Sequence, residues 1–196
     1  LLDALDGNVN SVSGRLTIDA GEGTADTLKV YDAGDTEREA GELKSDEILG
    51  MGMRLGISYA GFELLKIWLG DNDNSVFVDS THTGVTFIDL GDEQPIVNGT
   101  NDVINVRSTS GTTTINAGNG NDIIRINFDR NGKQTFISGI DGELTLHGEQ
   151  GSDRYEIGLA GQISSRINVF DQSRADPGID RLRIFDTNGP GPVKFA

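Results

Sequence analysis

A five-residue phrase recurs six times in this chain of 196 residues. Each copy starts with Asp or Asn and has apolar residues at its third and fifth positions. The copies are residues 26–30, 74–78, 102–106, 122–126, 153–157 and 180–184. Their starts lie 48, 28, 20, 31 and 27 residues apart (26 to 74 to 102 to 122 to 153 to 180), and the first gap has room for an extra unit. Repeats of this period indicate a chain that stacks one unit upon itself.

A second phrase precedes most copies of the first. It has a short apolar alternation and occupies residues 14–19, 85–89, 111–116, 142–147 and 165–169, and the first four copies end in Asp, Asn or His. Together the two phrases predict a coil made of a strand, a Gly-rich turn, an Asp, a second strand and a loop. Residues 14–18 also match residues 142–146 at a shift of 128, which suggests a larger repeat laid over the smaller one.

Side chains two residues apart share one face of a strand, so each phrase places two apolar side chains inward. We expect one interior ladder of apolar pairs from the Asp phrases, beginning with Leu28 and Val30, and a second from the other phrases, beginning with Leu16 and Ile18. The 27 glycines supply the corners that such a chain needs. The predicted fold is all-β: a right-handed parallel β-helix, or β-solenoid, with irregular coils of about 20–30 residues.

The domain organisation follows from the same pattern. Residues 1–187 form one β-solenoid segment, in which the charged stretch 32–47 is predicted to leave the stack as a loop. Residues 188–196 are rich in Pro and Gly and indicate an end or linker. Residues 62–69 allow a helix or a buried strand. The chain begins without Met, and we expect it to be a piece of a larger protein.

Charge and composition disfavour several classes of function. The formal net charge of −15 disfavours nucleic acid and anionic membranes as partners, because both attract basic proteins. Divalent cations suit such a surface, although the charge can also serve solubility alone. There is no Cys for disulfides or thiolate metal sites, and no run is long and apolar enough for membrane insertion.

Residues 49–53, 57–70, 80–84 and 117–124 resemble repeats of very large secreted, adhesin-like bacterial proteins. The resemblance extends from about Gly14 to Ile184. It implies an extracellular or cell-surface location, a structural or adhesive role, and glycans or other cell-surface components as partners. The oligomeric state is left open, because neither end of the sequence shows a clear cap over its last strand edges.

Residues 117–125 are also similar to the calcium-binding nonapeptide of RTX proteins, with Ala117 in place of the first Gly. The similarity implies Ca²⁺ at turns near Asp19, Asp26, Asn116 and Asp122, because this hard cation prefers oxygen ligands. The near-matches are separated by whole coils, however, whereas RTX units run in tandem. The alternative is that each Asp or Asn caps its turn by accepting a backbone N–H bond.

An enzyme is the next alternative, and the sequence favours a non-enzyme. A carbohydrate-binding or polysaccharide-degrading β-helix would use carboxylates and a basic residue on one outer face. The candidates are Asp79, Asp89, Asp102, Arg107, Arg125 and His82, and none of them breaks the repeat as a catalytic site would. His147 is expected to serve as a turn residue, and Trp68, Tyr59 and Phe62 are expected to be buried. A trimeric phage tail-spike segment is the third alternative.

Overall fold

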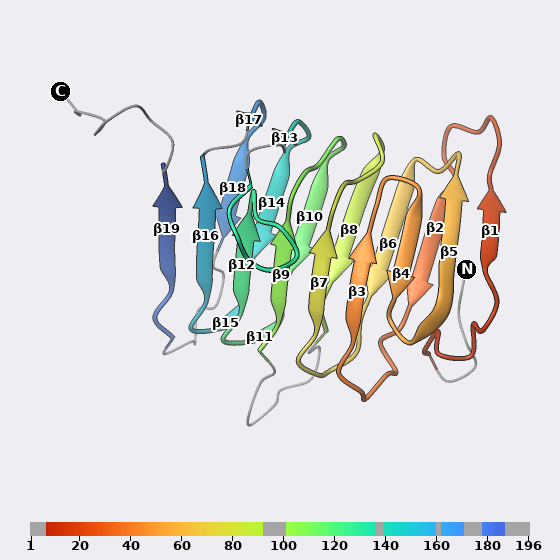
Figure 1. The fold of residues 1–196 in the computed structure, drawn as a ribbon, viewed down its shortest axis with the longest axis horizontal. Coiled ribbons are helices and arrows are strands. Elements are labelled where there is room, and N and C mark those ends of the chain that lie inside the picture. The colour runs from red at the N-terminus through yellow and green to blue at the C-terminus, as the bar shows by residue number, and fades with distance from the viewer. Residues whose placement is uncertain (1–6, 92–100, 136–138, 160–161, 171–177, 187–196) are drawn as a thin grey trace.

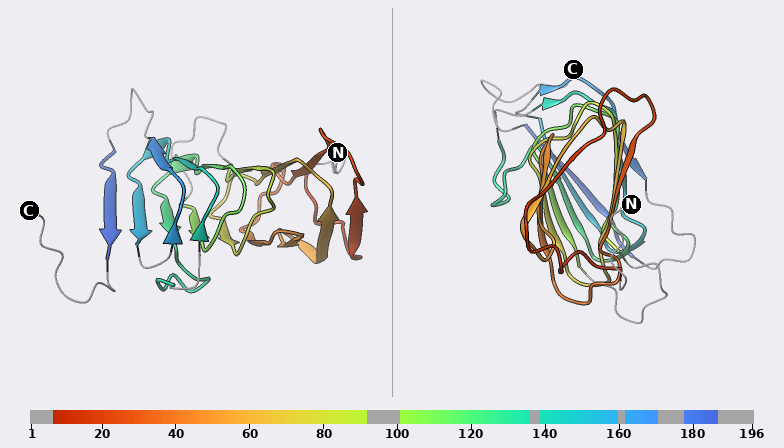
Figure 2. Two further views of the ribbon diagram at one scale, coloured as in Figure 1. Left: turned by 90° about the horizontal axis from the view of Figure 1, so that it is seen from above. Right: turned by 90° about the vertical axis from the view of Figure 1, so that its right-hand side faces the viewer.

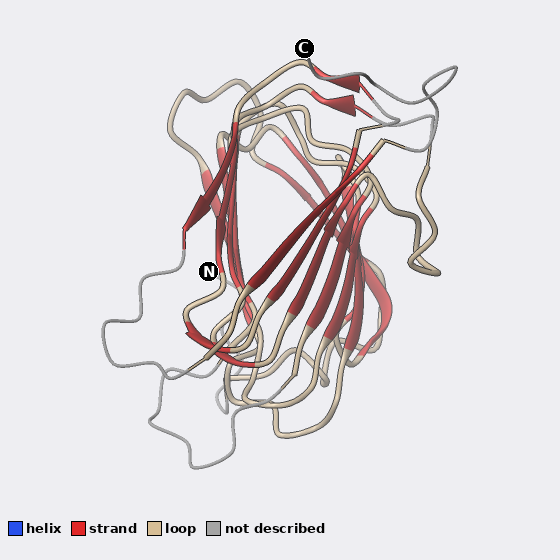
Figure 3. Cartoon of the chain, turned by 90° about the vertical axis from the view of Figure 1, so that its left-hand side faces the viewer, coloured by secondary structure: helices blue, strands red, loops and turns tan. Residues whose placement is uncertain are grey.

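The structure is a computed structural model that describes residues 7–91, 101–135, 139–159, 162–170 and 178–186. Within these ranges the chain is all-β, with strands and turns and no helix, as the sequence predicts. Most strands belong to two long sheets that face each other as two layers (Figures 1, 2 and 3). No helix that could cross a membrane occurs in the described ranges.

The front layer of Figure 1 is a nine-stranded sheet. In spatial order it contains β1 (Leu16–Asp19), β5 (Met53–Ala60), β4 (Glu47–Gly50), β3 (Ala40–Leu43), β7 (Ser75–Val78), β9 (Val103–Val106), β12 (Ile123–Ile126), β16 (Arg154–Gly158) and β19 (Arg181–Phe185). The layer behind it is a six-stranded sheet of β2 (Thr27–Tyr31), β6 (Leu64–Trp68), β8 (Val85–Asp89), β10 (Thr113–Asn116), β14 (Leu144–His147) and β18 (Ile167–Phe170). Two short pairs lie in the connections: β11 (Asn119–Gly120) with β15 (Gln150–Gly151), and β13 (Gly139–Ile140) with β17 (Gln162–Ile163).

From β6 onward the chain passes alternately through the two sheets, and equivalent strands pair in parallel. In the nine-stranded sheet, the residues in register with Val76 are Ile104, Ile124, Tyr155 and Leu182. They follow one another at steps of 28, 20, 31 and 27 residues (76 to 104 to 124 to 155 to 182). These steps equal the last four spacings of the Asp phrase, so its parallel register from residue 74 onward is confirmed.

The register of the first two strands differs from the prediction. Leu28 and Val30 pair with Leu65 and Ile67 in the six-stranded sheet, instead of joining the ladder of the later Asp phrases. The strand with Leu16 and Ile18 pairs with β5 in the nine-stranded sheet. The 128-residue similarity therefore relates strands of different sheets. An alternating strand of four residues fits either sheet, because both bury one face in the same core.

The stretch 32–47 was expected to leave the stack, and this is wrong. It contains β3, which pairs in parallel with β7, and it reaches the start of β4. β4 runs antiparallel to both β3 and β5, so these three strands form a meander within the front sheet. Leu43 and Ile48 are fully buried. Each of these two side chains belongs to a short alternation of apolar and polar residues that is surrounded by charged residues in the sequence. Their burial provides enough apolar surface to hold the segment in the sheet.

The core lies between the two layers, and its two ends differ. At the N-terminal end, Val9 belongs to the buried core, and its N–H donates to Asp32 Oδ1 at 2.9 Å. Leu28, on the edge strand β2, is buried there. At the C-terminal end, Leu182 and Ile184 of the edge strand β19 are 54% and 59% exposed, although they occupy core positions in register with β16. The two ends therefore differ in how deeply their edge strands are buried.

Glycine is required where successive coils approach each other most closely. A Cβ on Gly142 would overlap the carbonyl oxygen of Gly111, and a Cβ on Gly111 would overlap that of Gly84. We expect Gly111→Ala to lower the free energy of unfolding by about 1–3 kcal/mol, since the backbones must move apart to admit a methyl group. Gly14 opens the same phrase in coil one and has open space around it, so Gly14→Ala is the matched control. Urea denaturation should separate the two variants, and equal stabilities would refute the close approach.

Candidate functional site

A row of turn residues runs along the stack at the start of β7, β9, β12, β16 and β19, and all but the last of them are buried. The N–H of Asn74 donates to Asp102 Oδ1 at 2.5 Å, and the N–H of Asp102 donates to Asp122 Oδ1 at 2.8 Å. The N–H of Asp122 donates to Asp153 Oδ1 at 2.9 Å, and that of Asp153 to Asp180 Oδ1 at 2.9 Å. These five residues, here called the Asp ladder, join each coil to the next by a charge-assisted hydrogen bond.

A second row lies one residue earlier in each turn and is more exposed. The N–H of Asn101 donates to Asp73 Oδ1 at 2.9 Å, and that of Asn121 donates to Asn101 Oδ1 at 3.1 Å. The row continues from the N–H of Ser152 to Asn121 Oδ1 and from the N–H of Ile179 to Ser152 Oγ, both at 2.9 Å. The coil turns are therefore held together by two parallel rows of side-chain to backbone bonds.

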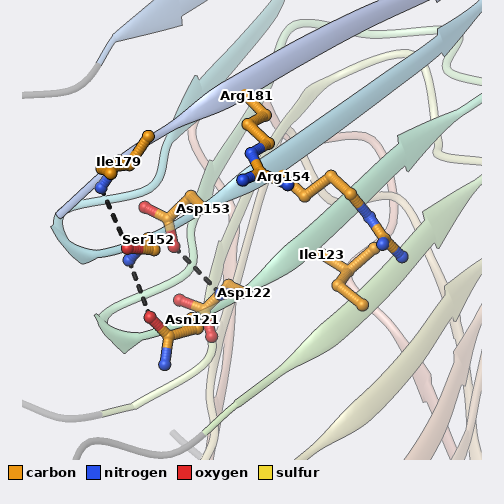
Figure 4. A pocket seen from close by; sticks show the side chains of 8 residues that line it. All are labelled: Asn121, Asp122, Ile123, Ser152, Asp153, Arg154, Ile179 and Arg181. Carbon is orange, nitrogen blue, oxygen red and sulfur yellow. Dashed lines mark hydrogen bonds between the residues drawn. The ribbon is translucent and has the colours of Figure 1, made fainter.

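A surface groove with a volume of about 390 Å³ lies beside these rows at the C-terminal end of the stack. Its lining comes from three repeated positions of the coil, which are the two turn rows and the first residues of β12, β16 and β19. The lining residues, shown in Figure 4, are Asn121, Asp122, Ile123, Ser152, Asp153, Arg154, Ile179 and Arg181. The groove thus has a polar wall of turn side chains and a second wall that carries two arginines.

The outer faces of the same three strands carry four arginines and one glutamate. Glu156 is buried, and its carboxylate forms ion pairs with three of the arginines. The distances to its oxygens are 2.7 Å from Arg125 Nε, 3.4 Å from Arg154 Nε and 3.9 Å from Arg183 Nη1. Arg181 is in register with Arg154 and forms no ion pair with any described residue. Four positive groups stand against one carboxylate on these outer faces, while the lining of the groove itself carries two arginines and two buried carboxylates, Asp122 and Asp153.

The outer face of the six-stranded sheet carries aromatic rings. Trp68 stacks face to face on Tyr31, with ring centroids 4.4 Å apart, and Phe87 lies at 6.0 Å on the other side of Trp68. Lys66 Nζ lies 5.9 Å from the centroid of Trp68. The expectation of a buried aromatic cluster is therefore met by Tyr59 and partly by Phe62, but it is wrong for Trp68, which points outward. Because Tyr31 covers one face of the indole and Phe87 contacts it at a tilt, these rings join adjacent coils.

The four residues predicted near calcium lie in different parts of the stack. Asp19 ends β1 in the front sheet, while Asp26 precedes β2 in the rear sheet. Asn116 ends β10 and Asp122 precedes β12, on the other connection between the sheets. Asp19 Oδ1 accepts the N–H of Gly21 at 2.9 Å, and Asp122 is part of the Asp ladder. The contact of Asp19 lies within its own turn, whereas that of Asp122 joins two neighbouring coils. No group of three or more His, Asp or Glu able to hold a metal is found among the described residues.

The candidate catalytic residues are spread over several coils. Asp79 and Arg107 form an ion pair at 2.6 Å, Asp102 belongs to the Asp ladder, and Arg125 binds Glu156. Asp89, Asn116 and His147 share one row on the rear sheet, as expected for a common turn position. In that row the His147 ring stacks on Phe170 with centroids 5.4 Å apart. Asp19, expected in the same row, lies in the front sheet.

His82 braces the loop before β8. Its Nδ1 accepts the N–H of Gly84 at 3.2 Å, which leaves Nε2 to donate to the carbonyl oxygen of Val85 at 3.2 Å. Burial lowers the pKa of His82, and a proton on Nδ1 would also remove the bond from Gly84. Burial likewise raises the pKa of the nearby Tyr59, whose hydroxyl donates to the carbonyl oxygen of Lys44 at 2.7 Å. This arrangement is structural and holds the neutral imidazole.

Ser152, Arg154 and Arg181 line the groove but were not among the predicted site residues. In the sequence each of them is an ordinary outward or turn position of the repeat. Aligning the outward positions in register gives Ile123, Arg154 and Arg181 as one row, with Arg125, Glu156 and Arg183 as the next. That alignment is the signal that reveals the local excess of arginine.

Comparison of the chain with protein-family models, with curated proteins and with solved structures gives no match.

Proposed function

We propose that the chain is a structural and adhesive module of a large secreted or cell-surface protein, folded as a right-handed parallel β-helix. Its role in this proposal is mechanical. Coil-on-coil backbone bonds and apolar ladders make a stiff rod, and the outer faces of the rod carry groups that bind to surfaces.

The observation that carries the proposal is the unbroken register of the Asp ladder and the apolar ladder from β7 to β19. Each coil contacts the next through the same set of positions, which is the arrangement of a quasi-one-dimensional repeat array. The apolar side chains of β19 supply a second argument. Their exposure at core positions gives the stack a face on which a further coil can be placed.

Single-molecule force spectroscopy tests the mechanical role. The chain is placed between copies of a small helical reference domain and pulled from both ends. We expect it to unfold at higher force than the reference domain and to release length in steps of about 7–11 nm, the extended length of coils of 20 to 31 residues. Unfolding at or below the force of the reference domain would contradict a stiff module. Repeating the pulls with Ca²⁺ and with chelator determines whether calcium stiffens it.

A further inference from the structure

We propose that the groove beside β12, β16 and β19 binds an anionic saccharide through Arg154 and Arg181. This inference rests on the adhesive part of the proposed function and names the chemistry of the partner. The ligand class is a sugar that carries a carboxylate or a sulfate group, since both present oxygen pairs that match a guanidinium.

The two arginines are the first element of the site. They occupy directly paired positions of neighbouring strands, where like charges repel each other unless an anion lies between or beside them. Arg154 shares Glu156 with Arg125 and Arg183, while Arg181 has no acidic partner among the described residues. In Figure 4 the side chain of Arg181 extends toward the base of Arg154, whose own guanidinium lies farther away, beside Ile123. An anion bound at this pair would relieve the repulsion.

The opposite wall supplies hydrogen-bond donors for hydroxyl and ring oxygens. Ser152 Oγ accepts the N–H of Ile179, so the hydroxyl keeps its own hydrogen to donate. The Asn121 side chain directs its oxygen to the N–H of Ser152, and its NH₂ group at the exposed rim donates one hydrogen to Asn101 Oδ1 at 3.3 Å and has a second. The two ladder carboxylates beneath them accept backbone N–H groups and are about 1% exposed, so they present little surface to a ligand.

Apolar surface completes the match to a sugar. Ile179 is 68% exposed at the edge of the groove, and Ile123 lies below Arg154 in the same row. The apolar face of a pyranose ring can rest on such side chains while its polar rim meets the donors. A volume of about 390 Å³ falls within the range of small-molecule sites.

The test is a titration of the protein with three tetrasaccharides of equal length at low salt, followed by calorimetry. One is a polyuronate fragment, one is sulfated and one is neutral. We expect the two anionic sugars to bind more tightly than the neutral one, with affinity falling as salt is raised. The stronger of the two anionic sugars identifies the acid group.

Arg181→Ala should weaken anionic sugar binding by about 10- to 100-fold, the loss typical of one charge-assisted hydrogen bond. Arg54→Ala is the matched control, because Arg54 is exposed on a strand of the same sheet and forms no ion pair among the described residues. Circular dichroism confirms that both variants fold. Equal affinities of the two variants, or equal binding of the neutral sugar, would overturn the proposal. A stiff rod in force spectroscopy without any sugar binding would overturn this inference alone.

Discussion

Replacing Ile124 by Ala is expected to lower the free energy of unfolding by about 2–5 kcal/mol. Ile124 is fully buried in β12, between its register partners Ile104 and Tyr155. Removing its side chain loses apolar burial and leaves a cavity in the middle of the ladder, where strands on both sides prevent collapse. Because each coil rests on its neighbours, a defect at this position weakens two coil interfaces.

The adjacent Ile123 provides the matched control for this prediction. It is the same residue type on the same strand, but it faces outward and is only partly buried. Ile123→Ala should therefore cost less than about 1 kcal/mol. Chemical denaturation of the two variants measures the difference directly. If Ile123→Ala were the more harmful change, the strand would face the other way and the register described here would be wrong by one residue.

The later coils could be predicted from the sequence because each Asp phrase carries its own start signal and two inward positions. From residue 74 onward the predicted register agrees with the pairing of Val76, Ile104, Ile124, Tyr155 and Leu182. The recurring Asp or Asn at the start of each phrase likewise marked the positions of the Asp ladder, whereas the second row of turn residues was not predicted. In this part of the chain, each copy of the phrase occupies the same place in the same sheet.

The first coils could not be predicted in the same way, because alternation specifies a buried face and leaves the choice of sheet open. Leu28 and Val30 satisfy an interior position equally well in either layer, and only the pairing with β6 decides between them. The β3–β4–β5 meander is hidden for a different reason. Its strands are short and interrupted by charged residues, and Leu43 and Ile48 are buried only because β7 and β5 lie beside them.

The arginine groove illustrates a third limit. A repeat is recognised by the residues that recur in every coil. The groove instead depends on outward positions, where the residue type differs from one coil to the next. Arg154 and Arg181 become neighbours only once the register of β16 and β19 is fixed. The charge of the whole chain also conceals them, since a net charge of −15 gives no indication of a local positive surface.

Asp122 allows the turn-capping and calcium interpretations to be separated. Asp122→Ala is expected to cost about 1–3 kcal/mol, because the buried N–H of Asp102 loses its acceptor. Asp122→Asn should retain most of the stability. An amide oxygen can accept the same bond, and Asn74 already occupies the equivalent position in the Asp ladder, where its Oδ1 lies 3.3 Å from the N–H of Glu39.

Thermal melting of the wild type and both variants, in chelator and with Ca²⁺ added back, measures these effects. If Asp122 acts as a cap, the wild type and Asp122→Asn melt at similar temperatures and respond alike to Ca²⁺. A ligand role predicts a different result: an ion that binds only the folded state raises stability as its concentration passes its dissociation constant. Loss of the carboxylate would then abolish a calcium-dependent rise seen in the wild type. Such a loss in Asp122→Asn, with the chelator curves unchanged, would overturn the capping interpretation and favour the calcium site implied by the RTX resemblance.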